Sequence, residues 1–227
     1  MAQTPSIRRV VLLCERLEDR LVPDAKSFVT SLYQNLLNRA PDPSGLSFYL
    51  QEINNGASNQ QIATEIWRSP EHRGIQVDGF YLTFLHRNAD TSGRAHWVNE
   101  LLSGNLNELG VTANFLTSAE YMTTRTTPLG FISGLYQDVL GRSPSTIEQL
   151  FWEDTLARMG SAAVTAGIIT SPEAYTDALS ADYLKYLNRS PDATGLDHYL
   201  NQLETSQATV ETVAETILGS AEYAANH

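Results

Sequence analysis

The sequence is poor in the residues that mark several common classes of protein. Its 227 residues include a single cysteine, Cys14, so no disulfide can form within the chain. Basic residues are scarce, because 15 Lys and Arg stand against 26 Asp and Glu, for a net charge of −11. A surface this acidic repels phosphate backbones and anionic lipid headgroups, so we expect neither nucleic acid nor a membrane surface as a partner.

Long apolar runs are also missing. The longest run near the start, Val10–Cys14, is interrupted at once by Glu15 and Arg16. A helix that spans a bilayer needs about 20 apolar residues, and an ordinary secretory signal needs an apolar stretch of about 7–15. We therefore expect no membrane insertion and no ordinary signal peptide.

What the sequence does contain is one pattern that occurs four times. An arginine anchors each copy, with a tyrosine six residues before it, an aromatic residue ten after it and a Ser-x-Glu motif about thirty after it. Three copies also have an aspartate three residues after the arginine and a glycine six after it. The anchors, spaced by 48, 55 and 47 residues, are Arg39, Arg87, Arg142 and Arg189. Agreement at so many positions indicates four units of common origin, each about 50 residues long.

Within a unit the apolar residues recur with helical spacing. In the first unit Phe28, Leu32 and Leu36 lie on one face of an amphipathic helix. A second helix is expected to bury the stripe Leu46–Ile53, and a third helix to begin at a capping box formed by Ser58 with Gln61. No segment alternates as a strand does. The sequence therefore predicts an all-α fold of four tandem three-helix units, packed as helical bundles.

The spacing between the second and third anchors is the longest, and it contains Thr123–Pro128. This polar, β-branched stretch closed by proline is typical of a linker. Because a three-helix unit alone would expose much of its apolar face, we expect the units to pair two and two. The predicted parts are an N-terminal segment at 1–26, a first repeat pair at 27–126 and a second at 127–227. Their net charges are +1, −3 and −9.

The stretch Leu32–Leu46, read as Leu-Tyr-x-x-Leu-Leu-x-Arg-x-Pro-Asp-x-x-Gly-Leu, resembles the domain of unknown function family 4214. Tyr183–Leu196 repeats the pattern, and the resemblance covers about residues 27–225. It implies helical modules of bacterial surface and exported proteins, with no established activity. The third unit lacks the aspartate and the glycine, and is similar to the helical linker domains of phycobilisomes, which hold other proteins together.

The N-terminal segment carries a second resemblance. Arg16–Pro23, Arg-Leu-Glu-Asp-Arg-Leu-Val-Pro, resembles a motif shared by many large exported bacterial proteins. It implies that residues 1–26 are a targeting or processing segment, with an exposed amphipathic helix as the alternative. A secreted or cell-surface location is expected on this ground, and a cytoplasmic one is the alternative.

Three recurring features could be read as ligand sites. The aspartates Asp42, Asp90 and Asp192 could suggest calcium, but each turn offers one carboxylate and one hydroxyl, whereas calcium takes six to eight oxygens. N-capping of the second helix explains them better.

The histidines form no metal-binding motif, and no cluster typical of catalysis or phosphate binding occurs. These histidines are His72, His86, His96, His198 and His227. We predict no catalytic, cofactor or metal site.

The aromatic residues ten after each arginine could form a sugar-stacking surface. They share the apolar stripe of the second helix, however, so core packing is the preferred interpretation. These residues are Tyr49, Trp97, Trp152 and Tyr199.

The arginine and the Ser-x-Glu glutamate are present in all four copies. They could contact a ligand, but four copies of one structural clasp are easier to explain than four copies of one binding residue. We predict bidentate pairs, shielded from solvent, between Arg39 and Glu71, Arg87 and Glu120, Arg142 and Glu173, and Arg189 and Glu222. The predicted function is a non-catalytic helical interaction or scaffold module of an exported or cell-surface bacterial protein, with unidentified protein partners. A glycan-binding module that uses the aromatics at the unit seams is the alternative.

Overall fold

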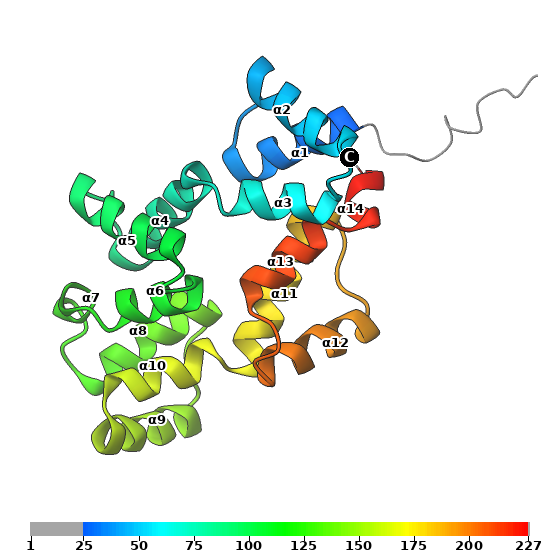
Figure 1. Ribbon diagram of the computed structural model, residues 1–227. Coiled ribbons are helices and arrows are strands. Elements are labelled where there is room, and N and C mark those ends of the chain that lie inside the picture. Colours follow the sequence, from blue (N-terminus) through cyan, green and yellow to red (C-terminus); the bar gives the residue numbers. More distant parts are fainter. Residues whose placement is uncertain (1–24, 227) are drawn as a thin grey trace, which may run out of the picture.

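The computed structural model describes residues 25–226, and they are folded into helices with no strand (Figure 1). The helices are α1 (Ala25–Leu37), α2 (Pro43–Asn54), α3 (Asn59–Trp67), α4 (Pro70–Leu85), α5 (Thr91–Ser103), α6 (Glu108–Leu116), α7 (Ala119–Thr123), α8 (Pro128–Leu140), α9 (Thr146–Met159), α10 (Ser161–Ile169), α11 (Pro172–Leu187), α12 (Ala193–Glu204), α13 (Val210–Leu218) and α14 (Ala221–Asn226). The predicted all-α fold is confirmed. Cys14 and nearly all of the predicted segment 1–26 lie outside the described residues.

Each unit consists of the three helices that the sequence predicts. They are α1, α2 and α3 in unit 1; the end of α4 with α5 and α6 in unit 2; α8, α9 and α10 in unit 3; and the end of α11 with α12 and α13 in unit 4. The first and third helices supply most of the core, with Leu32 and Ile62 fully buried in unit 1. The stripe of the second helix was expected to be buried, but α2 has no fully buried residue. Second helices lie at the outside of their units and cover the other two.

The Ser-x-Glu segments differ between units in a way that shapes the molecule. After units 1 and 3 this segment runs without a break into the first helix of the next unit, so α4 and α11 are each single helices of 16 residues. After unit 2 it forms the short helix α7, and the chain restarts at α8, where Thr127 is the N-cap and Pro128 the first helical residue. The linker predicted at Thr123–Pro128 is therefore the place where the chain turns back.

The units pair two and two, but not as the sequence suggested. One hydrophobic cluster joins unit 1 to unit 4, and a second joins unit 2 to unit 3. In each pair the third helices meet, α3 against α13 and α6 against α10 (Figure 1). The grouping 27–126 and 127–227 therefore does not describe how the cores are shared.

Helix continuity explains this pairing. A 16-residue helix is about 24 Å long, at 1.5 Å per residue, so α4 carries unit 2 away from unit 1, and α11 carries unit 4 away from unit 3. The break between α7 and α8 lets unit 3 fold back onto unit 2. Unit 4 is then returned to unit 1, where Phe28 of α1 packs edge-on against Tyr223 of α14, with ring centroids 6.0 Å apart.

The predicted helix caps are present. The carboxylates of Asp42, Asp90 and Asp192 each accept a hydrogen bond of 2.9 Å from the amide of the glycine three residues later. Ser58 and Gln61 form the predicted capping box at the start of α3. The aspartates are therefore N-caps, and they order the start of the second helix in three of the four units.

The recurring glycine is required by the recurring tyrosine. A Cβ atom built on Gly93 would lie 2.1 Å from the hydroxyl oxygen of Tyr81, and one on Gly45 would lie 2.5 Å from that of Tyr33. Both tyrosines are buried, so their rings cannot easily move away. The glycine therefore lets the first helix of the unit approach the start of the second.

Replacing Gly93 with alanine is expected to lower the free energy of unfolding by about 1–3 kcal/mol, because the new methyl group overpacks a buried contact. The control is Gly79→Ala in α4, where an added Cβ meets nothing within 4 Å. That change should raise the free energy of unfolding by about 0.5–1 kcal/mol, since alanine favours a helix interior over glycine. Urea unfolding measures both, and a Gly93→Ala protein as stable as Gly79→Ala would contradict the assigned role.

Candidate functional site

The four predicted clasps are present, and each is bidentate. In unit 2, Nε of Arg87 donates to Oε1 of Glu120 at 2.5 Å and Nη2 to Oε2 at 2.8 Å. The third nitrogen, Nη1, donates to the backbone carbonyl of Asn88. The guanidinium also lies over the ring of Tyr81, 4.7 Å from its centroid. The same contacts recur for Arg39, Arg142 and Arg189 with Glu71, Glu173 and Glu222.

The expectation that the clasps are shielded was wrong. The arginine side chains are 38–40% exposed and the glutamates 41–48% exposed. The arginine follows the end of one helix and the glutamate lies in the first turn of another. Both helix ends lie at the surface, so water reaches both side chains. The guanidinium lowers the pKa of each glutamate by hydrogen bonding. These clasps set the geometry of each unit and leave no recurring arginine free for a ligand.

A buried ionic cluster between the two pairs of units was not predicted. Arg73 of α4 is only 3% exposed, and its guanidinium bridges Glu108 of α6 and Glu211 of α13. Oε1 of Glu108 also accepts hydrogen bonds from Gln76 at 2.7 Å and from the indole of Trp67 at 3.1 Å. Burial and the charge of Glu211 raise the pKa of Glu108 to about 7. This cluster ties units 1, 2 and 4 together.

Two further groups lie near this cluster. Asp182 of α11 has one carboxylate oxygen, Oδ2, that is enclosed and accepts no hydrogen bond from the described residues. Burial and the charge of Glu108 raise the pKa of Asp182 to about 7. His72 is buried, with Nδ1 2.7 Å from the carbonyl oxygen of Trp67, and its pKa is lowered to about 4, chiefly by burial. The junction therefore holds more carboxylates than cations.

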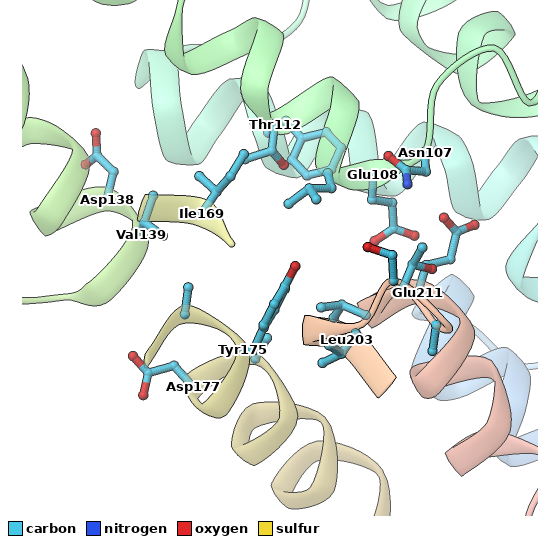
Figure 2. A pocket seen from close by; sticks show the side chains of 18 of the residues that line it. Asn107, Glu108, Thr112, Asp138, Val139, Ile169, Tyr175, Asp177, Leu203 and Glu211 are labelled. Atoms are coloured by element: carbon cyan, nitrogen blue, oxygen red, sulfur yellow. The ribbon is translucent and has the colours of Figure 1, made fainter. Parts of the chain in front are cut away.

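A cleft opens beside the cluster, between the two pairs of units (Figure 2). Its volume is about 620 Å³, and residues of α4, α6, α8, α10, α11, α12 and α13 line it. The walls are largely apolar, and Glu108 and Glu211 lie together at one end. Tyr175 of α11 projects its hydroxyl group into the middle of the hollow. No group of three or more His, Cys, Asp or Glu residues in the described part of the chain is arranged to hold a metal ion.

Comparison with protein-family models explains why the clasps recur. The model for the family described as Domain of unknown function (DUF4214) matches residues 19–75, 76–125, 112–178 and 179–227. The chain belongs to this family. A search of curated proteins and a search of solved structures found no match. The tandem DUF4214 copies account for the four units, while the similarity of the third unit to phycobilisome linkers stays a prediction.

The third DUF4214 unit has Glu148 where the other three units have a glycine, and it compensates locally. Glu148 forms a capping box with Ser145 and also accepts hydrogen bonds from Arg142. Instead of approaching a glycine, the hydroxyl of Tyr136 accepts a hydrogen bond of 2.9 Å from the indole of Trp152. The clasp therefore persists in this unit although the aspartate and glycine are absent.

The seam aromatics of the DUF4214 units are half-buried, as packing residues are. Trp97 lies 5.3 Å from the ring of Phe115, and Tyr49 lies 6.1 Å from that of Tyr33. His96 and His198 are exposed and pack edge-on against the aromatic residue that follows each of them. The rings therefore serve mainly to hold the second helix in place.

No described helix is long and apolar enough to cross a membrane.

The residues of the ionic cluster and the cleft are not part of the repeated pattern. Arg73 and Tyr175 occupy the same position, four after the serine of Ser-x-Glu, in units 1 and 3, whereas units 2 and 4 have Met122 and Ala224. Self-comparison of the sequence finds residues that recur, so it overlooked these. The sequence signal that could have found Arg73 is a difference between copies: it is a charged residue at a position where the other copies have none.

Proposed function

We propose that this chain is a non-catalytic interaction module of an exported or cell-surface bacterial protein, which binds a partner protein through a helical surface. The observation that carries the proposal is the outer face of α9 in unit 3. Leu150 and Phe151 each lie about one helical turn after Ile147, and the three side chains are 81% (Ile147), 63% (Leu150) and 59% (Phe151) exposed. Neighbouring apolar side chains that remain in water favour a protein partner.

Unit 4 supplies an internal comparison for this face. Where unit 3 has Ile147 and Leu150, unit 4 has Thr194 and Asp197, which are ordinary surface residues. Apolar residues at these positions are therefore not needed to fold a unit. The patch lies in the most acidic part of the chain, residues 127–227 with net charge −9, so a partner with an apolar patch and a neutral or basic border fits best.

The test is a variant in which α9 receives the residues of unit 4, Ile147→Thr with Leu150→Asp. The control is Leu82→Gln, which removes a leucine that is 53% exposed elsewhere on the surface. Cross-linking in a cell-envelope extract, followed by mass spectrometry, should recover a partner with the wild type and the control but lose it with the α9 variant. Light scattering of each protein shows whether that partner is a second copy of the chain.

Equal recovery with all three proteins would overturn the role of α9. The exported location is supported by the resemblance of Arg16–Pro23, and fractionation of the producing cells tests it separately. The half-buried position of Tyr49, Trp97, Trp152 and Tyr199 favours packing over sugar stacking, so we do not propose a glycan site.

A further inference from the structure

The cleft between the two pairs of units combines an apolar interior with an acidic end. Phe84, Val139, Ile169 and Leu203 contribute to its walls, and none of the described residues that line it is Lys or Arg. Glu108 and Glu211 lie at one end (Figure 2). Asp138 and Asp177, which also line the cleft, direct their carboxylates away from the hollow. A volume of about 620 Å³ falls within the range of small-molecule sites.

Tyr175 marks the interior of this cleft as a place for a polar ligand atom. Its side chain is only 8% exposed, and its hydroxyl has no hydrogen-bond partner among the described residues. Figure 2 shows that hydroxyl standing in the open space between the walls. A tyrosine hydroxyl in a buried position ordinarily finds a partner, so a ligand atom would complete it.

The acidic end carries more negative charge than its partner neutralises. Arg73 is the guanidinium that contacts both carboxylates, through Oε1 of Glu108 and Oε1 of Glu211. Within the described part of the chain, Oε2 of each glutamate accepts no hydrogen bond. Two carboxylates against one guanidinium leave a site that favours a further cation.

We propose that this cleft binds a small amphiphilic cation. Its ammonium group lies at the end formed by Glu108 and Glu211, and its apolar chain or ring lies among Phe84, Ile169 and Leu203. Charge complementarity selects the cation, because the cleft offers carboxylates and no basic side chain. The site is separate from the face of α9, so this proposal does not depend on the proposed partner surface.

Calorimetry with the full chain tests the proposal with three matched probes: 4-phenylbutylamine, 4-phenylbutanol and 4-phenylbutyrate. The amine should bind about tenfold more tightly than the alcohol, as one charge-assisted hydrogen bond predicts, and the carboxylate should not bind. A lysine side chain on a partner could present the same chemistry, so acetyl-Phe-Lys-amide is a fourth probe. Tighter binding of this peptide than of the free amine would overturn the assignment to a small molecule.

Variants locate the site. Glu211→Gln should reduce amine affinity about tenfold and leave the alcohol unchanged. Tyr175→Phe, which preserves the ring, should weaken binding of the amine several-fold, because it removes the hydroxyl that stands in the hollow. Asp197→Asn is the control, since this aspartate of α12 is exposed and does not line the cleft, and the variant should bind the amine as the wild type does. Circular dichroism confirms that each variant is folded.

Three results would overturn the proposal. They are equal affinity for amine and alcohol, a preference for the carboxylate, and amine binding that both Glu211→Gln and Tyr175→Phe leave unchanged. If Glu211→Gln does not fold, the comparison of Tyr175→Phe with Asp197→Asn decides the location alone.

Discussion

The Arg73→Met protein is expected to lose about 3–5 kcal/mol of its free energy of unfolding. Arg73 is 3% exposed and bridges Glu108 and Glu211, so its loss leaves two carboxylates, only 23% and 9% exposed, without a cation. Removing one partner of a buried ion pair is costly for this reason. Urea unfolding followed by circular dichroism measures the loss.

The control is the same substitution in a clasp, Arg87→Met. The pair of Arg87 with Glu120 is bidentate, but its side chains are 38% and 48% exposed. Exposed pairs are worth about 0–1 kcal/mol, because water and salt screen them. Equal losses from the two substitutions would contradict the distinction between a buried junction and a surface clasp. Adding Glu108→Gln to Arg73→Met should recover part of the lost stability, since it removes one of the unpaired charges.

Asp182→Asn is expected to stabilise the protein at pH 8 and to leave its stability unchanged near pH 4. Burial and the charge of Glu108 raise the pKa of Asp182 to about 7, and the ammonium group of Lys185 only partly opposes them. A carboxyl group whose folded pKa is raised binds its proton more tightly in the folded state, so stability falls as pH rises from about 4 to 7. Asparagine stays neutral throughout. Because the pKa rises from the ordinary 3.8 to about 7, and each pH unit corresponds to about 1.4 kcal/mol, the gain at pH 8 should be on the order of 4 kcal/mol.

Thermal or urea unfolding of both proteins across this pH range gives the difference directly. His72 and the clasp carboxylates titrate in both proteins, so to first order their contributions cancel. Glu108 is coupled to Asp182, so the measured difference reports on the pair. Asp177→Asn makes the same chemical change at an exposed position of the same helix, α11, and serves as the control. A pH-independent difference for Asp182→Asn would mean that water reaches that carboxylate.

Structural features that the units share could be predicted from the sequence, because the residues that form them recur in each copy. The pairs of Arg39 with Glu71 and of Arg189 with Glu222 could be found because both partners recur at fixed spacing. The caps at Asp42 and Asp90 could be found because an aspartate before a helix has one common use. The exposure of the clasps could not be predicted, because it depends on which helix ends lie at the surface once the units have packed.

The pairing of units could not be predicted, because it depends on the length of the helix that begins at each Ser-x-Glu motif, and the motif itself does not reveal that length. Ser69-Pro70-Glu71 and Ser118-Ala119-Glu120 look alike, yet the first begins a 16-residue helix and the second a short one that ends before Pro128. The cleft follows from that pairing, because units 2, 3 and 4 all contribute to its walls. Tyr175 and Glu211 become neighbours of one hollow only after the chain has turned back.

The union of the first unit with the last also sets the order of events during synthesis. Asn35 of unit 1 donates its hydrogen bond to the hydroxyl of Tyr223, which lies 188 residues later in the chain. At about 5–20 residues per second, the first unit waits roughly 10–40 s for that partner. Units 2 and 3 are neighbours in sequence and meet earlier. The pair of units 2 and 3 can therefore form during synthesis. The pair of units 1 and 4 forms last, after the core of units 2 and 3.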